Sequence, residues 1–162
     1  MGDKTTSASM FQSWIISAYR ATAFVMGARQ LKMFVKGMGE VFIDDLPERI
    51  GVTRDQETDP AANILAFAKV EDQTGAYDKD HVNVEIEGNN FRITFPSCPY
   101  AGPCGEVLAE LIESGQFTKK NLPCIRSDIS SALISESTGN KTRYELTQFA
   151  PGFKCVSNVE LV

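Results

Sequence analysis

Apolar residues recur at helical spacing through the first part of the chain. From Ser9 to Met38 the residues are mostly good helix formers, and no proline interrupts them. Apolar residues spaced by three, four and seven predict one broad buried stripe: Met10, Trp14, Ala18, Ala21, Val25, Ala28 and Val35. A second set widens this stripe: Phe11, Ile15, Phe24, Leu31 and Phe34. We therefore expect a central helix, preceded by a disordered tail over residues 1–8 and broken near Gly37, where glycine lowers helix propensity.

A second helix is predicted after an acidic stretch. Asp44 to Thr58 contains a proline and a glycine and is typical of a loop or a short helix. Asp59-Pro60 is a favourable helix start, since aspartate caps and proline suits the first helical turn. We expect a helix over 61–72 that buries Ile64, Leu65, Phe67 and Ala68.

The hydrophobic period changes from about 3.6 to two at His81. Val82, Val84 and Ile86 alternate with polar residues, and Phe91, Ile93 and Phe95 resume the alternation after Gly88-Asn89-Asn90. This pattern predicts a β-hairpin with one buried face.

The last third predicts two helices and a second hairpin. Pro103 and Pro123 open helices over about 104–114 and 124–135, and strands follow over 142–149 and 153–161. The expected fold is α+β: N-terminal helices packed on a four-stranded antiparallel sheet of two hairpins, with two intervening helices. We expect a single domain over 1–162, with a helical part (9–75) and a hairpin-helix-helix-hairpin part (80–162).

Composition and charge narrow the classes of function. The chain has 43% hydrophobic and 23% charged residues and a net charge of −5, with no run of Lys and Arg. We therefore expect no nucleic-acid partner. Polar residues interrupt the uncharged N-terminal stretch, which predicts neither a membrane-spanning helix nor a secretory signal. The expected compartment is the cytoplasm, where cysteines are kept as thiols or metal ligands.

The main candidate chemistry is a cysteine cluster. Cys98 and Cys104 bracket a proline-containing turn, Cys124 follows Pro123, and Cys155 lies in the last predicted strand, on one face with Phe153, Val159 and Leu161. We expect Cys104 and Cys124 at helix N-termini, where backbone N–H groups favour thiolate. Together the four cysteines predict a metal site, with zinc as the cofactor.

Alternatives to zinc stay open. The thiols could ligate an iron–sulfur cluster, serve as redox or catalytic groups, or pack as small apolar residues. Asp128, one helical turn after Cys124, could act as an acid–base group or as a substitute ligand. His81, Arg126 and Tyr100 are expected at the surface.

Residues 80–162 resemble two related families: the 4-vinyl-reductase-type, or hydrocarbon-binding, domain and the L-2-amino-thiazoline-4-carboxylic acid hydrolase-like family. The motifs that carry the resemblance are Cys98-Pro99-Tyr100, Pro123-Cys124-Ile125-Arg126-Ser127-Asp128, Tyr144-Glu145-Leu146-Thr147 and Gly152-Phe153-Lys154-Cys155. The resemblance implies structural zinc beside an apolar ligand pocket, the four cysteines as ligand positions, Asp128 as the matching acid, and a homodimer paired through the long helix.

Three functions follow as hypotheses. The first is a domain that binds a small apolar molecule in a pocket walled by the 14–35 helix and the sheet, next to a cysteine-ligated metal. The second is a hydrolase-like enzyme acting on a small sulfur- or nitrogen-containing compound. It would use Cys104 or Cys124 as nucleophile, or a metal-bound water with Asp128 as base. The third is an accessory subunit of a larger complex.

Overall fold

The computed structural model describes residues 4–50, 59–73, 82–96, 98 and 100–162. Helices and short helical turns occupy α1 (Lys4–Met26), α2 (Ala28–Ile50), α3 (Pro60–Gln73), α4 (Ala101–Pro103), the π-helical turn η1 (Cys104–Leu108), α5 (Ala109–Glu113), the 3-10 turn η2 (Lys119–Asn121) and α6 (Ile125–Thr138). The strands are β1 (Asn83–Glu87), β2 (Asn90–Phe95), β3 (Thr142–Gln148) and β4 (Cys155–Leu161). The predicted α+β class with a four-stranded antiparallel sheet is confirmed.

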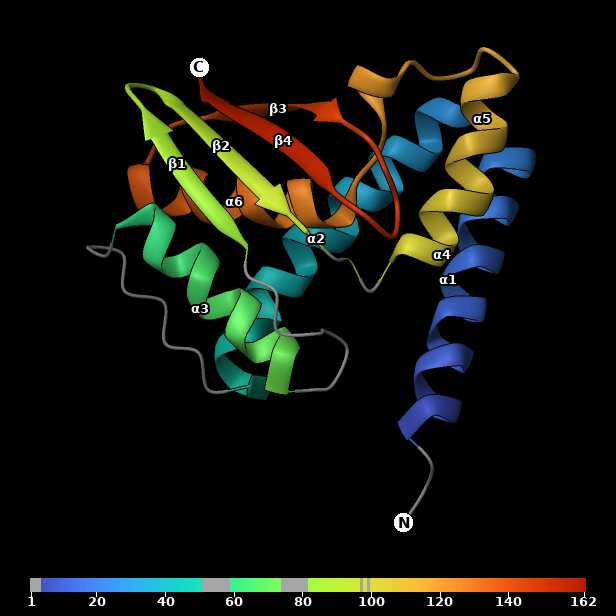
Figure 1. The fold of residues 1–162 in the computed structure, drawn as a ribbon, viewed down its shortest axis with the longest axis horizontal. Helices are drawn as coiled ribbons and strands as arrows, with labels where there is room; N and C mark the ends of the chain where they lie inside the picture. Colours follow the sequence, from blue (N-terminus) through green and yellow to red (C-terminus); the bar gives the residue numbers. More distant parts are fainter. Residues whose placement is uncertain (1–3, 51–58, 74–81, 97, 99) are drawn as a thin grey trace.

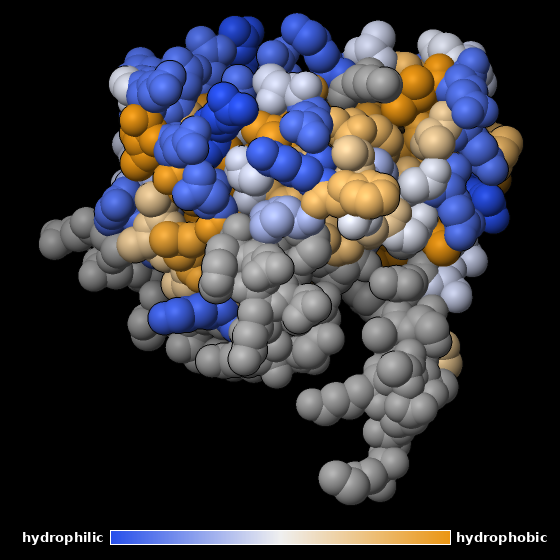
Figure 2. All heavy atoms as spheres, in the orientation of Figure 1, coloured by the Kyte–Doolittle hydropathy of each residue, from blue (hydrophilic) through white to orange (hydrophobic). Residues whose placement is uncertain are grey.

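The strands lie in the order β1-β2-β4-β3, so β2 and β4 form the centre of the sheet. Gly88, at φ +60°, makes the tight turn between β1 and β2 that the Gly-Asn pair predicts. On the inner face Ile93 pairs with Ser157 and Phe95 with Cys155, and all but Cys155 are fully buried. The opposite face carries mostly charged and polar side chains, and hydrophilic residues cover much of it in Figure 2.

The central helix is α6, not the N-terminal helix. It contacts β3 and β4 on one side and α2 and α3 on the other (Figure 1). Ile129 and Ile134 are buried there, and so are the polar residues Arg126, Ser127 and Ser130. Helices α2 and α3 lie against α6, and α3 also contacts β1 directly.

The break in the N-terminal helical segment lies at Gly27, not near Gly37. Gly27 has φ +87°, a conformation that favours glycine, and it separates α1 from α2. Helix α2 continues through Gly37 and Gly39 to Ile50. The first part of the 44–58 stretch, which was expected to be a loop or a short helix, therefore belongs to this helix, and residues 51–58 lie outside the described part. Helix α1 begins at Lys4, within the segment predicted as a disordered tail.

The buried face of α1 also differs from the prediction. Ile15, Tyr19 and Ala23 face the core, whereas Met10, Trp14 and Val25 of the predicted stripe are 72%, 61% and 83% exposed. Helix α1 has apolar residues on both faces, and the spacing of residues alone does not decide which face is buried. Other apolar residues that the sequence placed inside are also exposed: Phe24, Phe34, Leu65, Ile86 and Phe153.

Candidate functional site

All four cysteines line one cavity, although they come from separate parts of the chain. Cys98 follows β2, Cys104 begins η1, Cys124 precedes α6, and Cys155 begins β4. Pairing of β2 with β4 sets Cys155 opposite Phe95, close to the point where the chain leaves β2 toward Cys98. The sheet and two helical segments thus bring together side chains that are up to 57 positions apart in sequence.

Local hydrogen bonds fix the backbone at three of the cysteines. The Ala101 amide donates to the Cys98 carbonyl over 3.0 Å, which closes the turn before α4. The Cys104 amide donates to the Tyr100 carbonyl over 2.9 Å, so Cys104 lies inside a helical turn and not at the helix start that we expected. Cys124 does lie at a helix start, as the N-cap of α6, and its amide donates to the Tyr144 hydroxyl over 3.0 Å.

The cavity is small and apolar. Besides the cysteines, its lining includes Phe95, Leu108, Leu146, Phe149 and Pro151. Its volume is about 20 Å³, which is enough for one water-sized sphere and far below the roughly 300 Å³ of the smallest drug-sized ligand sites. The cavity therefore has room for a single ion but not, in this structure, for an organic molecule.

Arg126 is the site residue that the sequence interpretation missed. It was expected at the surface, but it is 2% exposed and lines the cysteine cavity. Its Cζ lies 5.2 Å from the centroid of the Phe95 ring, within the range of a cation–π interaction. The sequence does contain a signal for the burial of Arg126, because Arg126, Ile129 and Leu133 follow the three-and-four spacing of the buried face of α6.

A buried tyrosine from α1 adjoins the same site. Tyr19 is 1% exposed, and its hydroxyl lies within electrostatic range of Cys104 and Cys124. Burial raises its pKa well above the usual value, and the nearby cysteines raise it further. Tyr19 is therefore a neutral phenol beside the cysteines.

The four thiols are protonated in the metal-free chain. Burial raises the pKa of all four, and that of Cys98 rises to about 12 although the Arg126 guanidinium lowers it in part. Burial thus favours the protonated thiol at Cys104 and Cys124, contrary to the expectation of thiolate at these two positions. A bound metal would reverse this balance, since it binds thiolate directly.

Asp128 does not line the cysteine cavity. It lines an open polar groove of about 460 Å³ between α2, α6 and β3, together with residues that include Lys36 and Lys141. Its Oδ2 lies 3.0 Å from the Tyr144 hydroxyl, and burial raises its pKa to about 7. Tyr144 thus bonds to Asp128 on one side and to the Cys124 amide on the other.

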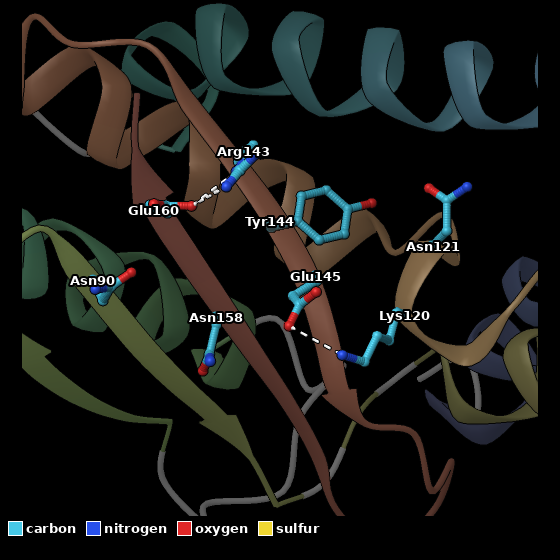
Figure 3. Close-up of a pocket in the computed structure, with 8 residues that line it drawn as sticks. All are labelled: Asn90, Lys120, Asn121, Arg143, Tyr144, Glu145, Asn158 and Glu160. Atoms are coloured by element: carbon cyan, nitrogen blue, oxygen red, sulfur yellow. Dashed lines mark hydrogen bonds and ion pairs between the residues drawn. The ribbon is translucent and has the colours of Figure 1, made fainter.

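Another groove lies on the opposite face of the sheet. It has a volume of about 470 Å³ and is lined by polar side chains of β2, β3, β4 and η2. Figure 3 shows two ion pairs across it, Lys120 with Glu145 and Arg143 with Glu160. Because it is open and polar, it differs from the apolar ligand pocket that we expected.

The cysteine cavity does not have the geometry of a formed metal site. Sulfurs on one zinc ion lie about 3.8 Å apart, since each Zn–S bond is about 2.3 Å. Within the described residues, no group of three or more His, Cys, Asp or Glu side chains lies close enough to hold one ion. The four cysteines surround one point without converging on it. His81, the one histidine, lies outside the described residues.

No model of a known protein family and no curated protein matches this chain. The family resemblance noted in the sequence therefore stays a hypothesis. In the described part of the chain, no helix is long and apolar enough to cross a membrane. The geometry of the cysteine cavity is thus the main observation that bears on function.

Proposed function

We propose that this chain is a metal-binding module whose four cysteines hold one metal centre in the apolar cavity between α6, β4 and η1. The observation that carries this proposal is that Cys98, Cys104, Cys124 and Cys155 all line that one cavity. Four thiolates from four separate segments are a donor set that suits zinc, and a closed site of this kind stabilises a fold.

Zinc is the preferred metal because the cavity holds one small sphere. Binding requires the four Sγ atoms to move closer together than they lie in this structure. An iron–sulfur cluster is the alternative, since each thiolate would then bind its own iron and the sulfurs could stay farther apart. A cluster would, however, need a larger cavity than the present one.

The positive charge of Arg126 supports a negatively charged metal–thiolate centre in the cysteine cavity. Four thiolates on one divalent zinc carry two negative charges, and a buried charge needs a partner of opposite sign. The Arg126 guanidinium lines the cavity, and its charge lowers the pKa of both Cys98 and Cys155. It would offset part of the charge of a metal–thiolate centre.

The four cysteines are free thiols, which suits a reducing compartment such as the cytoplasm. A small apolar molecule beside the metal would have to displace side chains, because the cavity has only about 20 Å³. The exposed apolar face of α1 favours a protein partner, either a second copy or a subunit of a larger complex.

A hydrolase-like enzyme is a weaker alternative. Buried, protonated thiols are poor nucleophiles, and Asp128 lies in a different groove from the cysteines. Among the described residues that line the cavity, no carboxylate could serve as a base for a metal-bound water.

Metal analysis of the native protein tests the proposal. We expect about one equivalent of zinc per chain in protein purified without chelators, and its loss in Cys104→Ser and Cys124→Ser. Phe149→Leu is the matched control, because it changes the cavity wall without removing a sulfur. If the analysis finds iron together with inorganic sulfide, the metal centre is an iron–sulfur cluster and not zinc. Protein that holds neither metal and takes up neither would overturn the proposal.

A further inference from the structure

The polar groove on the sheet face that points away from α6 has the size of a site for a small molecule. Its volume is about 470 Å³, within the roughly 300–1,000 Å³ that is typical of ligand sites. Side chains of β2, β3 and β4 form its floor, and the 3-10 turn η2 lies at one side (Figure 3). This space, the sheet groove, is lined by three asparagines, two ion pairs and one tyrosine.

The charged side chains of the sheet groove are paired with one another. Lys120 Nζ lies 3.9 Å from Glu145 Oε1, and Arg143 Nη2 lies 2.6 Å from Glu160 Oε2. The two positive and two negative charges balance, so a charged ligand would be attracted by one member of a pair and repelled by the other. In the contacts among the described residues, each carboxylate uses one of its two oxygens, which leaves the second oxygen as an acceptor for a ligand.

Three asparagine amides add donors and acceptors from three elements. Asn90 begins β2, Asn158 lies in β4, and Asn121 ends η2. Lys32 of α2 donates to Asn121 Oδ1, so the Asn121 amide nitrogen is left as a donor. Asn158 Oδ1 is buried and has no hydrogen-bond partner among the described residues, and a ligand hydroxyl that reached it would satisfy a costly orphan acceptor. The groove therefore offers hydrogen bonds of both kinds.

One aromatic ring borders these polar groups. Tyr144 lines the sheet groove, and its ring lies between Arg143 and Asn121 in Figure 3. Hydrogen bonds to the Cys124 amide and to Asp128 hold its hydroxyl in place. The ring thus gives the groove a fixed apolar surface beside its hydrogen-bonding groups.

We propose that the sheet groove binds a neutral saccharide, as a site separate from the cysteine cavity. Sugar hydroxyls both donate and accept hydrogen bonds, so they match amides and half-used carboxylates that strands and ion pairs hold in position. The apolar C–H face of a sugar ring would contact the Tyr144 ring. Because the groove is open, the ligand keeps part of its hydration, and we expect dissociation constants in the millimolar range. The proposal does not depend on a bound metal.

Charged and apolar ligands fit the sheet groove less well. A phosphate or a nucleic acid would find Lys120 and Arg143 already paired and would lie beside two glutamates, in a chain with a net charge of −5. A cation would meet the same lysine and arginine. An apolar molecule would desolvate charged groups without giving them hydrogen bonds.

NMR titration of the full chain tests the site. The probes are glucose, galactose, mannose, N-acetylglucosamine, maltose and cellobiose, each up to about 50 mM, because weak binding is expected. We expect at least one sugar to shift the side-chain amide signals of Asn90, Asn121 and Asn158 with a saturable dependence on concentration. The phosphorylated form of that sugar should bind more weakly. No saturable shift with any probe, shifts that map outside the groove, or tighter binding of the phosphorylated form would overturn the proposal.

Two variants locate the binding within the groove. Glu145→Ala removes a carboxylate from the groove and should weaken binding of the sugar at least about tenfold. Glu85→Ala is the matched control, because Glu85 also forms an ion pair of 3.9 Å, with Arg92, on the same sheet face but outside the groove. It should leave the affinity unchanged.

Circular dichroism and thermal melting show whether either variant is misfolded. Should Glu145→Ala fail to fold, Asn121→Ala removes an exposed amide from η2 and should also weaken binding. Equal affinities of the groove variant and Glu85→Ala would show that the sugar does not bind in the sheet groove.

Discussion

The backbone amide of Cys124 donates a hydrogen bond to the Tyr144 hydroxyl over 3.0 Å, and this bond joins the start of α6 to β3. Cys124 is the N-cap of α6, but its side chain makes no capping bond. The Tyr144 hydroxyl accepts a hydrogen bond from one of the free N–H groups at the start of α6. The Cys124 side chain lines the cavity. The Tyr144 hydroxyl also lies 3.0 Å from Asp128 and 3.3 Å from the Leu122 carbonyl.

Replacing Tyr144 by phenylalanine should destabilise the fold. The Cys124 amide would lose its acceptor in a part-buried position, which typically costs about 1–2 kcal/mol of unfolding free energy. Chemical denaturation of both proteins measures the difference. Arg143→Gln is the control, because it removes an exposed ion pair with Glu160 from the same strand and should cost less than about 1 kcal/mol. Equal losses in the two variants would contradict the prediction.

Asp128 should make stability depend on pH. Its folded-state pKa is raised to about 7, from 3.8, mainly by burial; Lys32, Lys36 and the Tyr144 hydroxyl lower it, and Glu40 raises it. Between pH 4 and 7 the unfolded chain has lost this proton while the folded chain keeps it. The unfolding free energy therefore falls as pH rises through this window, by at most about 1.4 kcal/mol per pH unit, and levels off above pH 7.

The test compares wild type with Asp128→Asn by denaturation at pH 5 and pH 8. The amide does not ionise, so the variant should lose less stability between the two values than wild type does. Glu160→Gln, which removes a half-exposed carboxylate of β4, should follow wild type. A wild-type curve parallel to that of Asp128→Asn would show that the carboxyl titrates normally.

Gly39 and Gly37 of α2 should respond in opposite ways to alanine. A Cβ at position 39 would lie 3.2 Å from Asp128 Cβ and 3.4 Å from the Ile129 amide nitrogen, whereas a Cβ at position 37 would meet nothing within 4 Å. Gly37→Ala should therefore stabilise the helix by about 0.5–1 kcal/mol. Gly39→Ala would push α2 from α6 and should destabilise by about 1 kcal/mol despite the same gain in helix propensity.

Thermal or chemical unfolding of the two variants measures this difference. They share the helix, the substitution and nearly the same position, so the contrast isolates the contact between α2 and α6. Stabilisation by both substitutions would mean that the helices can separate at little cost.

The sequence predicted the sheet better than the helices. Alternation of apolar residues around Gly88 predicts β1 and β2 because a two-residue period also specifies which face is buried. Helix α1 carries apolar residues all round, so its spacing predicts a helix but not its buried side. The break at Gly27 depends on a left-handed backbone conformation, which Gly37 or Gly39 could equally have adopted.

The candidate site was predictable in part. The turn prolines and strand pairing allow the cysteines to meet, and the structure places them around one cavity. Arg126 escaped prediction because arginine is rarely buried, although its position on α6 repeats with Ile129 and Leu133. Tyr19 comes from a helix about 80 residues before the first cysteine, and spacing along the sequence gives no sign of that contact.

Removing the metal should lower the melting temperature of the protein. A centre held by Cys98, Cys104, Cys124 and Cys155 would tie η1, α6 and β4 together, and a ligand that binds only the folded state stabilises it. We expect chelator to lower the melting temperature of wild type by several degrees, at about 2–4 °C per kcal/mol for a chain of this size. Readdition of zinc should restore the melting temperature.

Cys124→Ser, which lacks one ligand, should melt at a lower temperature and respond little to chelator. If chelator lowers both melting temperatures equally, or neither, the metal does not stabilise the fold through these cysteines.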